Sequence, residues 1–96
     1  MSVLFRYKFQ PEAEFAEVED TLFLALSATE AMHGSSQTEI VLRYWSEPKN
    51  RAVIIDGSNA IGETLACVFH DLIKKSVAPT DFRLERVPFG KDARCV

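Results

Sequence analysis

The sequence predicts an α+β fold, a two-layer sandwich in which two helices cover one face of a four-stranded antiparallel sheet. Residues 3–9, 39–45 and 82–87 alternate apolar and polar side chains with the period of a half-buried strand. Two longer segments place apolar residues at the three-to-four spacing of an amphipathic helix. The segments follow one another as strand, helix, strand, strand, helix, strand, without an internal linker or a low-complexity stretch.

The first part of the chain is expected to form a strand and a long helix. In residues 3–9 the odd positions are apolar, while the even positions include Arg6 and Lys8. We expect Pro11 to open the helix, because the first helical position needs no N–H donor. Gly34 is expected to end it, because glycine readily adopts the left-handed cap conformation. The expected buried stripe of this helix consists of Phe15, Val18, Leu22, Leu26 and Thr29.

A hairpin is expected next. A polar loop over residues 35–38 leads into a strand over 39–45. The two faces of this strand would carry Ile40, Leu42 and Tyr44 on one side and Val41, Arg43 and Trp45 on the other. A turn over residues 47–50 joins it to a return strand over 52–56, whose consecutive apolar residues indicate a central position in the sheet.

The second helix and the last strand complete the prediction. The helix is expected to begin with Ser58 or Asn59 as its N-cap and to end near Lys75, whose charge suits the negative helix terminus. Residues 82–87 then form the fourth strand. This β-α-β-β-α-β order predicts the ferredoxin-like arrangement. Right-handed crossovers place both helices on the same face of the sheet and leave the other face open.

The composition indicates one globular domain over residues 1–96, with a flexible tail over 88–96. The chain is 47% hydrophobic and 26% charged, and no apolar run approaches the roughly 18 residues of a membrane span. The N-terminus lacks the features of a signal peptide, and Cys67 and Cys95 are expected to remain reduced thiols. We therefore expect a cytoplasmic protein. No Walker loop, dinucleotide fingerprint or Ser-His-Asp arrangement is present, so no cofactor is expected and a non-catalytic role is favoured.

The open sheet face is the leading candidate for a contact surface. The predicted interface combines cations with apolar and aromatic groups, namely Arg6, Lys8, Val41, Arg43, Trp45 and Arg83. Tryptophan and arginine are enriched at the positions that contribute most to protein binding, so the expected partner is a second copy or another protein. A solvated sheet face is the plain alternative. RNA binding is a third possibility, disfavoured by the net charge of −3 and by the absence of outward aromatic residues on the predicted central strands.

The charges are distributed unevenly along the chain. The segment between Lys8 and Arg43 contains no lysine or arginine, yet it holds half of the 14 acidic residues. The first helix therefore presents a second candidate surface, made of Glu14, Glu17, Asp20 and Leu24. This surface would suit a basic partner or the basic sheet face of a second copy, and a solubilising surface is the alternative.

The turn after the return strand is a candidate site for an anion or a metal. Asp56, Gly57, Ser58 and Asn59 connect a strand to a helix start, where backbone N–H groups attract anions. Residues 53–62 also resemble the opening strand motif of the NYN/PIN-like nucleases, which implies a metal-binding role for Asp56. The resemblance covers ten residues, and the later aspartates do not fall at the ends of predicted parallel strands. A helix cap with a tight turn is therefore the favoured interpretation.

The second helix carries a further group of polar residues on one side. Glu63, Cys67, His70 and Asp71 share this side and could approach a metal ion or support thiol chemistry. Ligands from a single helix, without one from elsewhere, make a poor zinc site, so an exposed helix face is favoured.

Overall fold

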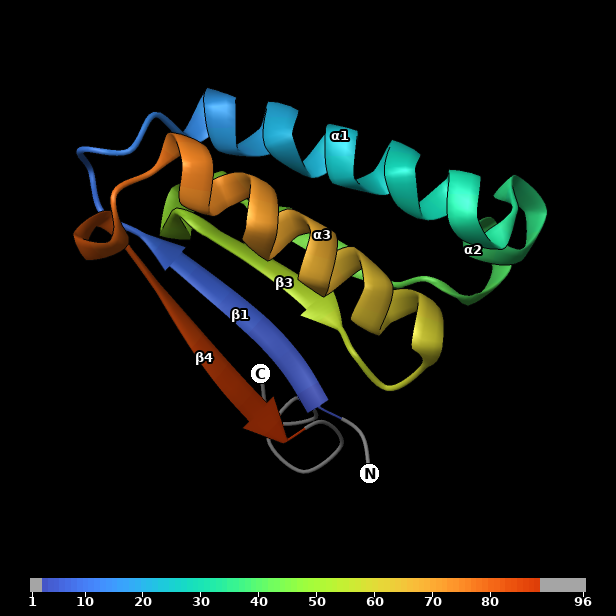
Figure 1. Cartoon of the computed structure of the whole chain (residues 1–96). Helices are drawn as coiled ribbons and strands as arrows, with labels where there is room; N and C mark the ends of the chain where they lie inside the picture. The colour runs from blue at the N-terminus through green and yellow to red at the C-terminus, as the bar shows by residue number, and fades with distance from the viewer. Residues whose placement is uncertain (1–2, 89–96) are drawn as a thin grey trace.

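The computed structural model describes residues 3–88 and confirms the predicted fold. The elements in chain order are β1 Val3–Phe9, α1 Phe15–His33, α2 Ser35–Val41, β2 Tyr44–Glu47, η1 Pro48–Asn50, β3 Ala52–Asp56, α3 Ala60–Ser76, η2 Pro79–Asp81 and β4 Phe82–Pro88. The four strands form one antiparallel sheet in the order β2-β3-β1-β4. Helices α1 and α3 pack together on one face of this sheet, which is the ferredoxin-like arrangement (Figure 1).

The strand register determines which side chains share a face of the sheet. Arg6 on the central strand β1 pairs with Ile54 of β3 and with Glu85 of β4. Ile54 pairs in turn with Trp45 of β2. Directly paired residues project to the same side of a sheet, so these four side chains form one row across the face away from the helices. Tyr7, the next residue along β1, projects to the opposite side and is buried.

The core lies between the sheet and the two long helices. Its largest buried members come from all the layers and include Tyr7, Phe9, Val18, Leu22, Val53, Ile55, Leu65, Phe69 and Ile73. Ser46 Oγ on β2 donates a hydrogen bond of 2.8 Å to Glu19 Oε2 and ties α1 to its end of the sheet. β4 lies at the opposite edge, away from both helices (Figure 1), so Leu84 is only partly buried.

The predicted start of the first helix at Pro11 is wrong. Helix α1 begins at Phe15, and the preceding residues form a turn in which Ala13 N donates to Gln10 O (3.0 Å). The guanidinium of Arg51 donates to the carbonyl oxygens of Gln10 and Ala13 and lies 5.9 Å from the centroid of the Phe15 ring. The carbonyl groups of Gln10 and Ala13 thus have a partner outside the helix, the side chain of a residue distant in sequence. Residues 10–13 can therefore form a turn, and the helix begins at Phe15 instead of Pro11.

The predicted loop over 35–38 and strand over 39–45 are also wrong. Residues Ser35–Val41 form helix α2, and β2 covers only Tyr44–Glu47. Gly34, at a φ of 92°, redirects the chain after α1. Thr38 N then donates to Gly34 O (3.1 Å), Leu42 N donates to Thr38 O (2.9 Å), and the Thr38 side chain is buried. Val41 therefore lies on a helix and Arg43 in the connector before β2, not on a strand of the sheet.

The remaining elements agree closely with the prediction. Asn59 is the N-cap of α3, and its side chain accepts a hydrogen bond from Gly62 N (2.8 Å). β4 begins at Phe82 as expected but extends through Pro88, the first residue of the predicted tail. Residues 89–96 of that tail lie outside the described residues. None of the helices within residues 3–88 combines the length and the hydrophobicity needed to cross a membrane.

Candidate functional site

The candidate site is the open sheet face, centred on the row Trp45, Ile54, Arg6 and Glu85. Trp45 is 44% exposed although it is the largest side chain of the row. Lys8 and Arg83 pair directly with each other on β1 and β4 and project to the same side as Arg6. No helix among the described residues covers this face (Figure 1). The face therefore presents an indole and an isoleucine at one end and a charged cluster at the other.

The charged end of this face is organised around one carboxylate. Arg6 Nε and Nη2 donate to Glu85 Oε1 at 2.9 and 2.7 Å, and Arg83 Nη2 lies 2.9 Å from Glu85 Oε2. The hydrogen bond from Arg6 lowers the pKa of Glu85 below its ordinary value, with the charges of Arg6 and Arg83 contributing. Glu85 thus offsets part of the positive charge that the sequence predicts for this face.

The predicted interface residues do not all lie on the sheet. Arg6, Lys8, Trp45 and Arg83 share the open face, as expected from their strand positions. Arg43 lies beside β2, where its carbonyl oxygen accepts a hydrogen bond from Asp56 N (3.0 Å), and its side chain is exposed. A shallow hollow of about 250 Å³ joins it to the indole and is lined by Leu42, Arg43, Tyr44 and Trp45. Val41, on α2, is not part of this hollow.

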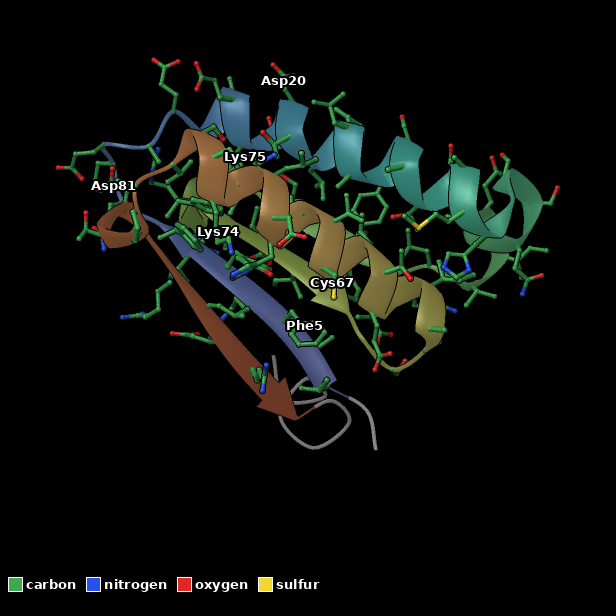
Figure 2. The ribbon with its side chains drawn as sticks, in the orientation of Figure 1. Phe5, Asp20, Cys67, Lys74, Lys75 and Asp81 are labelled. Atoms are coloured by element: carbon green, nitrogen blue, oxygen red, sulfur yellow. The ribbon has the colours of Figure 1, made fainter. Side chains whose placement is uncertain are left out.

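The second predicted surface lies on α1. Glu17, Asp20 and Leu24 are located on the helix, and Figure 2 shows Asp20 projecting away from the sheet. Glu14 precedes the helix as its N-cap residue. Phe23, Met32 and Ile40 are further exposed apolar side chains on α1 and α2, and the exposure of Met32 and Ile40 was not predicted from the sequence. The predicted strand placed Ile40 on the face opposite the outward residues, with Leu42 and Tyr44, but on α2 it is 77% exposed.

Several polar atoms of the Asp56–Asn59 turn make hydrogen bonds within the fold. Asp56 Oδ1 accepts a hydrogen bond from Ser58 N (3.0 Å), and Asn59 caps α3. Gly57 lies against the Phe5 ring, so closely that a Cβ at this position would be 2.2 Å from Phe5 Cε2. Across residues 3–88, no three or more His, Cys, Asp or Glu side chains form a group that could hold a metal ion. The observed contacts therefore match the helix cap and tight turn favoured from the sequence.

A groove of about 500 Å³ lies between α3 and the strands β1 and β4. Its lining residues are Phe5, Tyr7, Glu63, Ala66, Cys67, His70, Asp71, Leu84 and Arg86. Figure 2 shows the Cys67 side chain on α3 directed toward the end of β1 that carries Phe5. Tyr7 Oη lies 3.1 Å from His70 Nδ1, and the Arg86 guanidinium lies 5.9 Å from the centroid of the Phe5 ring. The sequence predicted the shared polar side of α3 but not this groove.

Burial of Tyr7 predicts a specific loss of stability at alkaline pH. Burial, followed by the nearby thiol of Cys67, raises the pKa of Tyr7 well above its ordinary value. In the unfolded chain Tyr7 ionises near pH 10, whereas in the folded protein it stays neutral. The unfolded state then binds fewer protons, so we expect Tyr7 to reduce the free energy of unfolding above about pH 10, by up to ~1.4 kcal/mol per pH unit.

Denaturant unfolding of Tyr7→Phe and of the wild type between neutral pH and pH 11 measures this contribution. The variant should be less stable at neutral pH, because it loses the hydroxyl contact with His70. Its stability should nevertheless fall less steeply than that of the wild type above pH 10. Parallel curves above this pH would show that the phenol ionises in the folded protein.

Comparison of the chain with protein-family models, with curated proteins and with solved structures found no match. The fold and the surface described above are therefore the basis for a functional assignment.

Proposed function

We propose that the protein is a non-catalytic association domain that binds a second copy of itself through the open sheet face. The exposed Trp45 side chain is the observation that carries this proposal. Trp45 is 44% exposed and lies beside Ile54, on a face that no described helix covers. Exposed apolar groups that adjoin one another on a sheet face favour contact with another surface, because contact removes them from water.

The surroundings of Trp45 suit a protein contact. The side chains of Arg6 and Arg83 are 41% and 68% exposed, so their guanidinium groups can donate further hydrogen bonds although both contact Glu85. Tryptophan and arginine are both enriched at the positions that contribute most to binding. The charged cluster at the other end would then form the polar rim around an apolar centre.

RNA binding is less well supported by the same face. Proteins that bind RNA on a sheet stack bases on aromatic side chains of the central strands. On the open face the central strands β1 and β3 present Arg6, Lys8 and Ile54, and Trp45 lies on the edge strand β2. The geometry therefore offers a single aromatic platform at the border of the sheet, which suits a protein anchor better.

Sedimentation of the wild type and of Trp45→Ala tests the proposal. We expect the wild type to self-associate and Trp45→Ala to raise the dissociation constant by about 30-fold or more, as for a tryptophan worth about 2 kcal/mol at an interface. Ile40→Ala is the matched control, because Ile40 is more exposed than Trp45 but lies on α2. This control should associate like the wild type.

Two outcomes would contradict the open-face contact. A wild-type chain that stays monomeric at about 1 mM, where a millimolar dimer is substantially formed, would exclude self-association of functional strength. Equal association of the wild type and Trp45→Ala would show that the contact lies on another surface.

A further inference from the structure

β4 is an edge strand whose outer hydrogen-bonding side is not paired with any strand of the described chain. Gln10 N donates to Asp81 O (2.8 Å), whereas Phe9 N donates to Arg51 O (2.8 Å) on the side of β3. N–H and C=O groups alternate between the two sides of a strand, so the even residues of β1 face β4. In the β1–β4 register these even residues oppose Arg83, Glu85 and Val87.

It follows that the intervening residues of β4 direct their backbone groups outward. The N–H and C=O groups of Phe82, Leu84 and Arg86 point away from β1, toward the free edge. Unpaired edge groups are a template for another strand. Charged side chains often protect such an edge by repelling an incoming strand. β4 carries Arg83, Glu85 and Arg86, and the first two are oppositely charged, lie two residues apart and project to the same face of the sheet.

From this pattern we propose that two copies of the chain pair antiparallel through β4, with the two-fold axis at Leu84, to form an eight-stranded sheet. In this register the outward groups of Leu84 bond to those of Leu84 in the second copy. The outward N–H and C=O groups of Phe82 bond to those of Arg86 in the second copy, and the outward groups of Arg86 bond to those of Phe82 in the second copy. Arg83 lies opposite Glu85 of the second copy on the open face. The two form a non-hydrogen-bonded pair, the type of cross-strand pair in which the side chains lie closest together.

The neighbouring registers are unfavourable. A two-fold axis at Glu85 would place two carboxylates opposite each other and would set Phe82 against Pro88, which has no N–H to donate. An axis at Arg83 or at Arg86 would place two guanidinium groups opposite each other. Among the axes at residues 83–86, only the one at Leu84 pairs opposite charges, so the sequence of β4 favours this register over its neighbours.

The helix side of β4 supports the same pairing. Leu84 is partly exposed and lines the groove between α3 and the strands β1 and β4. In the proposed register it meets Leu84 of the second copy, and Phe82 lies beside Arg86 of the second copy. The contact would cover the open side of both grooves and bury apolar surface that α3 leaves uncovered. It would also leave Trp45, on the opposite edge strand, free.

A charge-reversal experiment tests the register. Arg83→Glu would place two carboxylates together, the introduced one and that of Glu85 in the second copy, and Glu85→Arg would place two guanidinium groups together. Each variant alone should therefore dimerise at least about tenfold more weakly than the wild type. An equimolar mixture of the two variants should recover a dimer. In the mixed species residue 83 of each chain again faces residue 85 of opposite charge in the other chain. Circular dichroism of each variant checks that the monomer is folded.

Leu84→Pro tests the backbone contact independently of charge. The substitution removes an N–H that points away from β1, so the internal ladder is retained while the central pair of the proposed dimer is lost. The wild type should sediment as a larger species than Leu84→Pro. Equal sedimentation of the two, or a mixture of charge variants that remains monomeric, would overturn the β4 contact.

This inference does not rest on the open-face contact, and the two fail separately. If both contacts form, assemblies larger than a dimer are expected, and Trp45→Ala and Leu84→Pro should each reduce them to a dimer. If Trp45→Ala alone disrupts association, the β4 contact is wrong and the open-face contact stands. If Leu84→Pro alone disrupts association, the open-face contact is wrong and the β4 contact stands.

Discussion

Replacement of Phe69 by alanine is expected to lower the free energy of unfolding by about 3–5 kcal/mol. Phe69 lies on α3, is completely buried, and packs edge-to-face on Tyr7 with 5.0 Å between the ring centroids. Its removal would leave a cavity between α3 and the central strand. The loss is a large part of the total stability of about 5–15 kcal/mol of a domain this size. Denaturant unfolding measures it.

Phe23→Ala is the matched control for this prediction. The same side chain is removed, but from a position on α1 that is 61% exposed. We expect a change within about 0.5 kcal/mol. If Phe69→Ala does not fold, Phe69→Leu should show a smaller loss of the same sign. Similar losses at Phe23 and Phe69 would show that the core does not lie between α3 and the sheet.

Gly62→Ala is expected to lower the free energy of unfolding by about 3 kcal/mol, although alanine is the better helix former. Helix propensity alone would favour the variant by about 1 kcal/mol. A Cβ on Gly62, however, would lie 1.9 Å from the carbonyl oxygen of Asp56 and 3.0 Å from its carbonyl carbon. These atoms belong to the backbone, so α3 itself would have to move away from the end of β3.

Glu63→Ala provides the comparison at the neighbouring position. Glu63 is exposed in the first turn of α3, so this substitution should change stability by only a few tenths of a kcal/mol. Thermal or denaturant unfolding of the two variants separates helix propensity from close packing. A Gly62→Ala protein as stable as the wild type would mean that α3 does not approach Asp56 so closely.

The alternation of β1 and β4 and the apolar stripes of α1 and α3 predicted the fold, because local sequence patterns determine these elements. Two predictions were wrong where contacts between residues distant in the sequence determine the local structure. Pro11 fits a helix start, but Arg51 holds the carbonyls of Gln10 and Ala13 from 41 and 38 residues away. Residues 39–45 alternate like a strand, yet residues 35–41 form α2, where Thr38 is buried. No local pattern distinguishes these outcomes.

The candidate site, like the fold, was predictable only where local sequence patterns determine it. Strand parity alone placed Arg6, Lys8 and Arg83 on one face. The position of Glu85 between Arg6 and Arg83 requires the register of β1 with β4, and Arg6 and Glu85 lie 79 residues apart. The groove likewise depends on contact between Tyr7 and His70, 63 residues apart. A sequence pattern assigns faces, but it does not fix which residues of two remote strands become neighbours.

The location of Trp45 has a practical consequence. It is the single tryptophan of the chain, and its indole is partly exposed on the sheet face away from the core. Intrinsic fluorescence excited at the indole band therefore reports from one known place. A partner that covers this face should shift the emission to shorter wavelengths, whereas a chain that joins at β4 should leave the spectrum nearly unchanged. The unmodified protein thus carries its own optical probe for telling the two contacts apart.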